Sequence, residues 1–363
     1  MAAAFHSMMA WARAYERHLS AIAMAVGFVF DAYTFGQVDR PLTQLVFVSY
    51  LLMAGGALAL LHLREARGQN RDSRAHTILI MALQFALGAL LSGFCVFYIR
   101  SANLAASWPF LLFMAAVFIG NEYFREYTSR LVFSALVFFF SLYSYAILLV
   151  PVLIAQIGPR SFLMSGGLAV VAFFVYLQLL AWLGRDRYRD ARVQIAAGGL
   201  AITLVINLFY FAKIFPPLPL VLSDAGIYHS VKRSGADFEA KGEVEPGRWQ
   251  GLFGVHPTLH VMPGERLYLY TAVFAPYRLT TAIEHHWEWY DPAIRGWRPQ
   301  QTVRFNIRGG REDGYRGYSF RSGPRAGSWR VHVVTLDGRS IGQVRFEVQT
   351  ARQPPALQTI TLK

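Results

Sequence analysis

Two histidines stand beside a tryptophan and an acid in the run His285-His286-Trp287-Glu288. Histidine and glutamate bind metals and carry protons, so this run is a candidate for chemistry. Successive side chains of a strand point to opposite faces, so His286 and Glu288 share one face and His285 joins Trp287 on the other. Two ligands on one face do not complete a metal site, and the sequence shows no third ligand nearby. We therefore predict no metal site and no bound cofactor.

Signatures of a catalytic site are also missing. No Gly-x-Ser-x-Gly element marks a serine nucleophile, and the acids of this region are too dispersed to indicate a glycosidase pair. The single cysteine, Cys95, stands in an apolar run, which excludes a disulfide framework and a cysteine-based metal site within the chain. The sequence assigns no catalytic residue and does not favour an enzyme.

A run of arginines interleaved with aromatic residues is a better candidate for binding. Arginine forks suit phosphate or carboxylate groups, and flat aromatic rings suit sugars or lipid headgroups. We predict an anion- or headgroup-binding surface in this part of the chain. The alternative is that Arg311 and Arg316 bridge neighbouring strands after a tight turn at Gly309-Gly310. The predicted surface consists of Arg304, Arg308, Arg311, Arg316, Arg321, Arg325, Tyr315 and Tyr318.

The segments that must position these groups differ sharply in composition. The chain has 363 residues, of which 54% are hydrophobic, against about 45–50% for an average soluble domain. A helix that crosses a bilayer needs about 20 apolar residues. The sequence therefore predicts an α-helical polytopic membrane bundle of about seven transmembrane helices. The qualifying runs are 19–35, 42–63, 77–98, 106–122, 131–153, 161–183 and 194–214.

The fourth run is the weakest of the seven, because its apolar stretch ends at Asn121-Glu122. A re-entrant segment at 106–122 is the alternative. Basic residues predict the orientation of the spans, since cytoplasmic loops are enriched in Arg and Lys. With a cytoplasmic N-terminus, the inner segments hold twelve basic residues and the short outer segments hold four. Seven spans then place the C-terminal domain outside the cytoplasm.

Charged side chains within a span are costly and mark candidate functional sites. Asp31 lies toward the outer end of the first predicted span, and Lys213 lies at the outer end of the seventh. We predict that they form an intramembrane polar pair. The alternative is that Asp31 is hydrated at headgroup depth and that Lys213 extends its side chain to the interface.

The hydrophobic pattern changes to period two from Leu267 onward. Six or seven short strands at this spacing predict an all-β, immunoglobulin-like sandwich, with Trp287 and Trp329 in its core. An earlier strand is expected at 226–233. The candidate strands are 266–275, 283–290, 302–308, 315–321, 328–335 and 341–348.

The predicted organisation has five parts. They are an N-terminal cytoplasmic or interfacial segment (1–18), the transmembrane domain (19–214), a proline-rich linker (215–224), the extracytoplasmic sandwich (225–350) and a C-terminal tail (351–363).

Spaced motifs recur through the C-terminal region. They are Tyr270-Thr271-Ala272-Val273-Phe274-Ala275-Pro276, His285-His286-Trp287, Gly309-Gly310-Arg311, Gly314-Tyr315-Arg316-Gly317-Tyr318-Ser319, Gly327-Ser328-Trp329-Arg330-Val331, Asp337-Gly338-Arg339 and Ile341-Gly342. This set resembles the bacterial family known as domain of unknown function 2914, over about 225–350. The resemblance implies a β domain carried after a hydrophobic region, and a setting in the bacterial inner (cytoplasmic) membrane. With the orientation predicted from the basic residues, the domain is periplasmic or extracytoplasmic. The family name assigns no activity.

These features favour a membrane-anchored binding, sensing or interaction protein of the bacterial envelope. Its partners would be the lipid bilayer and an envelope protein, glycan or lipid headgroup. The alternative is a transporter or flippase for an envelope lipid or glycan precursor, with the sandwich as an accessory domain. The chain holds 35 basic and 22 acidic residues without a dense basic tract, so we expect no nucleic-acid partner.

Overall fold

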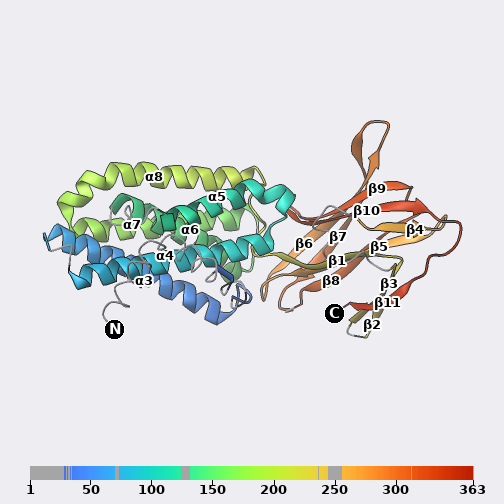
Figure 1. Ribbon diagram of the computed structural model, residues 1–363, viewed down its shortest axis with the longest axis horizontal. Helices are drawn as coiled ribbons and strands as arrows, with labels where there is room; N and C mark the ends of the chain where they lie inside the picture. The colour runs from blue at the N-terminus through green and yellow to red at the C-terminus, as the bar shows by residue number, and fades with distance from the viewer. Residues whose placement is uncertain are drawn as a thin grey trace, which may run out of the picture. The chain divides into compact units, whose positions relative to one another are not determined.

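The computed structural model describes residues 28–29, 31, 33, 35–69, 73–123, 131–235, 237–243, 256–311 and 313–362. The chain divides into two compact units (Figure 1). The first unit comprises Met1–Tyr98, Leu111–Leu149 and Ser165–Val205, and contains most of the helical residues. The second comprises Ile99–Phe110, Val150–Met164 and Ile206–Lys363, and contains all the strands of the described residues.

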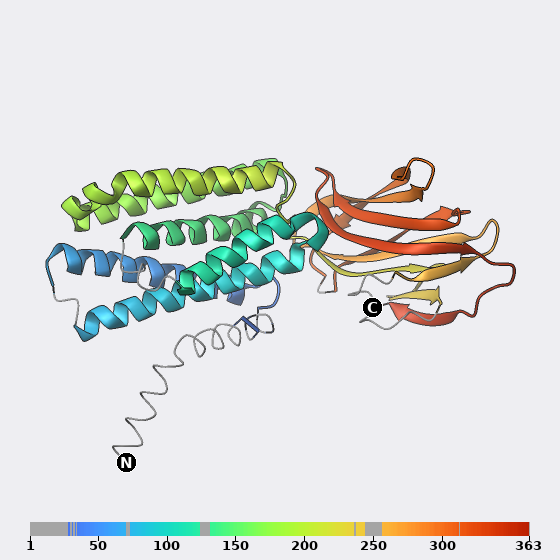
Figure 2. The ribbon, with the colours of Figure 1, turned by 45° about the horizontal axis from the view of Figure 1, so that its top comes forward.

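Six helices are present in the described part of the chain, and they lie side by side in both ribbon views (Figure 1, Figure 2). They are α3 (Pro41–Ala66), α4 (Arg74–Ser101), α5 (Leu104–Tyr123), α6 (Leu131–Ile154), α7 (Pro159–Leu183) and α8 (Arg185–Phe211). Prolines at the starts of α3 and α7 suit the first helical turn, where the missing N–H would have no helical partner.

The predicted number of seven helices is corrected to six. The first predicted span, 19–35, lies almost entirely outside the described residues. Five of the six described helices are long and apolar enough to cross a membrane. The exception is α5, whose apolar part, Ala106–Asn121, is shorter. The polar pair Asn121-Glu122 lies close to the end of α5. The same pair makes 106–122 the weakest of the predicted spans.

The seventh predicted span begins earlier than expected. The sequence predicts a loop at 184–193, whereas α8 already begins at Arg185. Arginine is a good helix former, and Asp186 in the first turn favours a helix start through its interaction with the helix dipole. The arginine-rich stretch therefore forms the first turns of α8.

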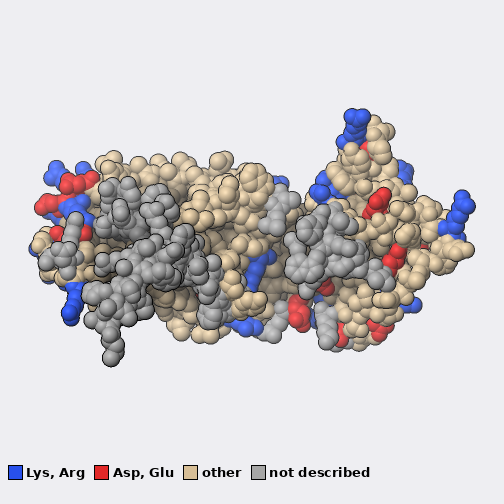
Figure 3. Space-filling view, viewed as in Figure 1, with Lys and Arg blue, Asp and Glu red and all other residues tan. Residues whose placement is uncertain are grey.

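Large apolar side chains project from α7 and α8. Val171 and Phe174 on α7 are 61% and 60% exposed, and Leu204 on α8 is 60% exposed. On the face drawn in Figure 3, the charged residues of the helical part gather toward the ends of the helices. Exposed apolar flanks between charged ends are the surface that a helix presents to lipid.

Eleven strands are present among the described residues of the second unit. They are β1 (Val221–Tyr228), β2 (Ser230–Ser234), β3 (Asp237–Gly242), β4 (Thr258–Val261), β5 (Arg266–Phe274), β6 (Thr280–Asp291), β7 (Gly296–Arg308), β8 (Tyr315–Ser322), β9 (Gly327–Thr335), β10 (Ser340–Thr350) and β11 (Gln358–Leu362). The six strands predicted from residue 266 onward are all confirmed as β5 to β10. The predicted early strand is resolved into β1 and β2, and the predicted tail contains β11.

Two of the three sheets share one apolar core. A three-stranded sheet has the order β1-β5-β8, and a five-stranded sheet has the order β4-β10-β9-β6-β7. Most neighbouring strands are antiparallel, but β4 runs parallel to β10. The core includes Leu267 and Leu269 from β5, Trp287 from β6 and Trp329 from β9. It lies between the two sheets, because it takes side chains from both.

The third sheet, which we name the cover sheet, consists of β11, β3 and β2 in that order. Its residues Val231, Ala240 and Leu362 pack with Tyr270 and Ala272 of β5. Strand β5 therefore has one face toward the core and the opposite face toward the cover sheet. This second face carries a separate aromatic cluster.

The predicted core positions of Trp287 and Trp329 are confirmed, with exposed fractions of 0% and 1%. Replacing Trp287 by Ala should lower the free energy of unfolding of the β domain by about 3–5 kcal/mol, because it leaves a large cavity. Urea denaturation followed by fluorescence measures this loss. Ile294→Ala, at a side chain that is 55% exposed, is the matched control and should change stability by less than about 0.5 kcal/mol. Equal effects of the two substitutions would contradict the core assignment.

Candidate functional site

The eight residues of the predicted arginine and aromatic surface lie on different faces of the β domain. In β8, Arg316 and Tyr318 point to the side of the cover sheet, whereas Tyr315 packs against the core. Arg304 in β7 binds Glu284 with its Nε and Nη2 atoms, at 2.9 and 2.7 Å. The guanidinium of Arg325 lies 5.5 Å from the ring centre of Trp289. Near the end of β7, Arg308 and Arg311 are exposed. Arg321 is half-buried. The structure thus brings together Arg316 and Tyr318, and the larger surface stays a prediction.

A row of aromatic rings forms around Tyr318. We call Phe238, Tyr268, Tyr318 and Phe320 the aromatic ledge. Ring centres are 6.2 Å apart for Phe238 and Tyr318, 5.9 Å for Tyr318 and Tyr268, and 5.7 Å for Tyr268 and Phe320. Tyr318 and Phe320 are 37% and 40% exposed. Pairing of β5 with β8 aligns Tyr268 with Phe320, so the register of these strands determines which rings are neighbours.

Polar groups border the aromatic ledge on two sides. The guanidinium of Arg266 lies 4.9 Å from the ring centre of Phe320, a cation–π distance. Arg316 donates a hydrogen bond to Asp237 of β3 at 3.0 Å. Beneath the ledge, Tyr270 is fully buried, and burial raises the pKa of its hydroxyl to about 12. The arrangement combines flat apolar rings with cationic and carboxylate groups at their margin.

His285 belongs to a buried polar network that joins the two sheets of the core. Its Nδ1 lies 2.9 Å from Ser319 Oγ on β8, and its Nε2 lies 3.1 Å from Thr271 Oγ1 on β5. Trp287 also donates a hydrogen bond to Ser319 Oγ, at 2.9 Å. Burial, with a smaller contribution from the nearby His286, lowers the pKa of His285 to about 3. The ring is therefore neutral at physiological pH, and it ties the sheets together out of reach of any ligand.

The other two residues of the first candidate run lie on the outer face of the five-stranded sheet. His286 Nε2 lies 2.9 Å from a carboxylate oxygen of Glu284, whereas Glu288 accepts a hydrogen bond from Arg330 at 2.5 Å. His286 and Glu288 therefore bind different partners. Among the described residues, no group of three His, Cys, Asp or Glu side chains has the arrangement of a metal site.

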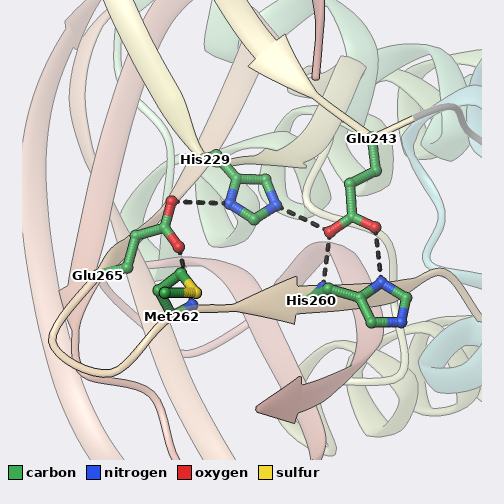
Figure 4. A network of polar contacts seen from close by, with 5 residues as sticks. All are labelled: His229, Glu243, His260, Met262 and Glu265. Atoms are coloured by element: carbon green, nitrogen blue, oxygen red, sulfur yellow. Dashed lines mark hydrogen bonds and ion pairs between the residues drawn. The ribbon is translucent and has the colours of Figure 1, made fainter. Parts of the chain in front are cut away.

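Four residues from separate segments form a second polar network (Figure 4). We name His229, Glu243, His260 and Glu265 the His229 clasp. His229 Nε2 lies 2.9 Å from Glu243 Oε1, and its Nδ1 lies 3.1 Å from Glu265 Oε1. The backbone N–H and Nδ1 of His260 lie 2.6 and 2.8 Å from the two oxygens of Glu243. The side chain of His229 is only 1% exposed, whereas His260 at the edge of the clasp is 48% exposed, so the buried part of the clasp is the His229 ring.

A polar cluster also lies within the helical unit, where its four residues His62, Glu65, His76 and Arg187 line a small pocket together with four apolar residues. Glu65 of α3 forms an ion pair with Arg187 of α8, and His76 of α4 lies 4.0 Å from the same carboxylate. His62 Nε2 lies 3.0 Å from the carbonyl oxygen of Leu180, so this nitrogen carries the proton. No local spacing indicates this cluster, because the ion pair of Glu65 with Arg187 depends on the packing of α3 beside α8.

The predicted pair of Asp31 and Lys213 falls in different units and stays a prediction. Asp31 accepts a hydrogen bond from Ser92 of α4 at 2.6 Å. Lys213 lies just beyond α8 in a left-handed backbone conformation, with φ 60°. The observed partner of Asp31 is thus a neutral hydroxyl.

One part of the chain matches a known family model. Residues 280–348 match the model described as Protein of unknown function (DUF2914). The resemblance to DUF2914 is thereby confirmed for the region from β6 to β10, a narrower range than the motifs indicated. No curated protein matches the chain.

Among solved structures, one match is "Pseudomonas fluorescens alkylpurine DNA glycosylase AlkC bound to DNA containing an abasic site analog". The match has a TM-score of 0.21 and 10% identity, and it covers 85% of this chain and 99% of that chain. A TM-score at this level supports no statement about fold or function.

The buried His285 should make the β domain sensitive to acid. Its folded pKa lies below the ordinary value of 6.5, so the unfolded chain binds the extra proton first as pH falls. Above pH 6.5, neutral His285 leaves the free energy of unfolding independent of pH. Between pH 6.5 and about pH 3, the free energy of unfolding should fall by up to about 1.4 kcal/mol for each pH unit. His285→Gln should reduce the slope of unfolding free energy against pH by that amount, measured by urea denaturation. Identical slopes for both proteins would contradict this account.

Proposed function

We propose that this chain is a membrane-anchored recognition protein of the bacterial envelope, and that its β domain binds an envelope glycan on the aromatic ledge. The observation that carries the proposal is the row of partly exposed rings with Arg266 beside it. Aromatic and arginine side chains dominate binding energy at interfaces, because they bury large areas at low entropic cost. Pyranose rings present flat C–H faces to such rings, and their hydroxyl or carboxylate groups suit the arginines.

We further propose that the β domain is an immunoglobulin-like sandwich. Three features support this assignment: the division into β1-β5-β8 and β4-β10-β9-β6-β7, the parallel pairing of β4 with β10, and the buried Trp287 on β6. If β1, β5 and β6 correspond to strands A, B and C, Trp287 occupies the strand of the characteristic immunoglobulin tryptophan. Folds of this type carry binding sites on surfaces that their scaffold holds rigid.

The proposed location is the bacterial inner membrane, with the β domain in the periplasm. If α3 to α8 all cross, the start of α3 at Pro41 also lies on the periplasmic side. A cytoplasmic N-terminus then requires the predicted span 19–35 as a further crossing. The distribution of basic residues supports this orientation, because the segments assigned to the cytoplasm hold twelve of the sixteen basic residues before residue 220. The arginine-rich first turns of α8 are among them. A periplasmic domain would face the envelope glycans directly.

The orientation predicts the behaviour of fusion proteins. Alkaline phosphatase fused after residue 220 should be active, because the enzyme requires export for activity. A fluorescent protein that folds only in the cytoplasm should stay dark at the same position. Fluorescence at this position together with an inactive phosphatase would reverse the proposed orientation.

The glycan proposal predicts that the aromatic ledge determines affinity. The double variant Tyr318→Ala and Phe320→Ala should weaken binding of soluble peptidoglycan fragments at least about tenfold, because two stacking surfaces are lost. Titration of the full chain in nanodiscs, followed by calorimetry, measures this change. Tyr277→Ala is the control, since Tyr277 is 64% exposed and lies outside the ledge. Equal affinity of the double variant and the control, or no binding to the unmodified protein, would refute the proposal.

The second candidate function is a transporter or flippase for an envelope lipid or glycan precursor. The observation that favours it is the cluster of Glu65, Arg187, His62 and His76 at the pocket between apolar helices. These residues lie at the ends of α3, α4 and α8 that the proposed orientation puts toward the cytoplasm. Ionisable side chains buried between spanning helices often mark a substrate or ion pathway. Transbilayer movement of a fluorescent lipid in proteoliposomes tests this candidate directly.

A further inference from the structure

The His229 clasp joins the cover sheet to the rest of the β domain. His229 stands between β1 and β2, where the chain leaves the three-stranded sheet and enters the cover sheet. Its backbone N–H donates to the carbonyl oxygen of Lys241 in β3 at 2.8 Å. Glu243 follows β3 directly. The clasp therefore connects β2 and β3 with His260 of β4 and with Glu265, in the turn before β5.

The geometry of the clasp requires a particular number of protons. Both ring nitrogens of His229 face carboxylate oxygens, at 2.9 Å from Glu243 and 3.1 Å from Glu265 (Figure 4). An ionised carboxylate only accepts hydrogen bonds, and a neutral imidazole carries a single N–H. Two ionised carboxylates are therefore satisfied only by a doubly protonated His229.

Other contacts keep both carboxylates in place. The backbone N–H of Met262 donates to Glu265 Oε2 at 3.0 Å, and His260 supplies the second oxygen of Glu243. Burial acts to raise the pKa of Glu243, but hydrogen bonds from His260 and His229 outweigh it and lower this pKa below its ordinary value. Glu243 is therefore ionised at neutral pH. In the described part of the chain, Glu243 and Glu265 are the charged groups in contact with His229, and His260 acts through Glu243.

We propose that the His229 clasp is a proton-operated latch that holds the cover sheet on the aromatic face of β5. The latch is closed when His229 carries both ring protons. Loss of one proton places a nitrogen lone pair against a carboxylate, so one attraction becomes a repulsion and the cover sheet loosens. The face beneath it includes Tyr228 and Tyr270, which are 6% and 0% exposed when the cover is closed. These rings lie beside the aromatic ledge in the same cluster.

The consequence for binding rests on the proposed function, whereas the latch itself does not. Phe238 of the cover sheet is one of the four ledge residues, and its ring centre lies 5.7 Å from that of Tyr270. Loosening the cover would remove Phe238 from the row and open the surface beneath it. The latch therefore regulates the shape of the proposed glycan site through the protonation of a residue outside it.

Hydrogen exchange of the full chain in nanodiscs, without any glycan, tests the latch. Peptides from 230–242 report on the cover sheet, and peptides from 327–348 report on the core. The chemical rate of amide exchange depends on pH in the same way for both sets of peptides. The protection of the cover-sheet peptides divided by that of the core peptides is therefore free of this dependence. We expect the relative protection of the cover sheet to fall about tenfold between pH 5.5 and pH 8.5, as a charge-assisted hydrogen bond is lost.

Glu265→Gln separates a proton latch from a merely structural contact. The glutamine amide can donate to Nδ1 of neutral His229 while its oxygen still accepts from Met262, so the clasp stays closed without the second proton. This variant should keep high protection of the cover sheet at both pH values. His332→Gln, on the five-stranded sheet, is the control and should respond to pH as the unmodified protein does.

Two results would overturn the latch. One is constant relative protection of the cover sheet in the unmodified protein between pH 5.5 and 8.5, and the other is an equal fall in protection in Glu265→Gln. Neither result depends on a ligand. A latch that responds to pH while peptidoglycan fragments fail to bind would refute the glycan proposal and leave the latch intact.

Discussion

The organisation of the β domain depends on strand β5, which is buried on both faces. Leu267 and Leu269 point into the core shared by two sheets, and Tyr270 points toward the cover sheet. A strand of a two-sheet sandwich ordinarily leaves its outer face to water. Because this outer face carries aromatic rings, it needs a second layer, and β2, β3 and β11 provide one. The aromatic ledge is the part of that face which the cover sheet leaves partly exposed.

Polar side chains hold the three layers of the domain in different ways. His285 joins the two core sheets as a neutral ring, and its hydrogen bonds to hydroxyl groups do not need a charge. His229 joins the cover sheet to β4 and β5 through two carboxylates, and this arrangement needs a charged ring. The first contact therefore needs no proton beyond the one on the neutral ring, whereas the second is the basis of the proposed latch. The difference arises from the partners, because hydroxyl groups donate or accept and carboxylates only accept.

Local patterns in the sequence predict the elements better than the site. Period-two alternation locates β5 to β10 and the buried tryptophans, because these strands each have one face in the core. It does not locate β11, a five-residue strand whose pairing with β3 is the reason it forms. The predicted surface includes Tyr318, but its ring partners Tyr268 and Phe238 lie on other strands and depend on register. The residues of the His229 clasp come from separate segments, so no local spacing indicates them.

The aromatic ledge on β3, β5 and β8 is the proposed binding site for a glycan. A hydrogen-exchange footprint of the full chain in nanodiscs, with and without peptidoglycan fragments, tests this proposal. Binding at the ledge should give new protection in peptides from 266–274 and 315–322 and leave exchange unchanged in 296–308, on the opposite sheet. Protection confined to 296–308 or to the helices, or no change with saturating fragments, would contradict it.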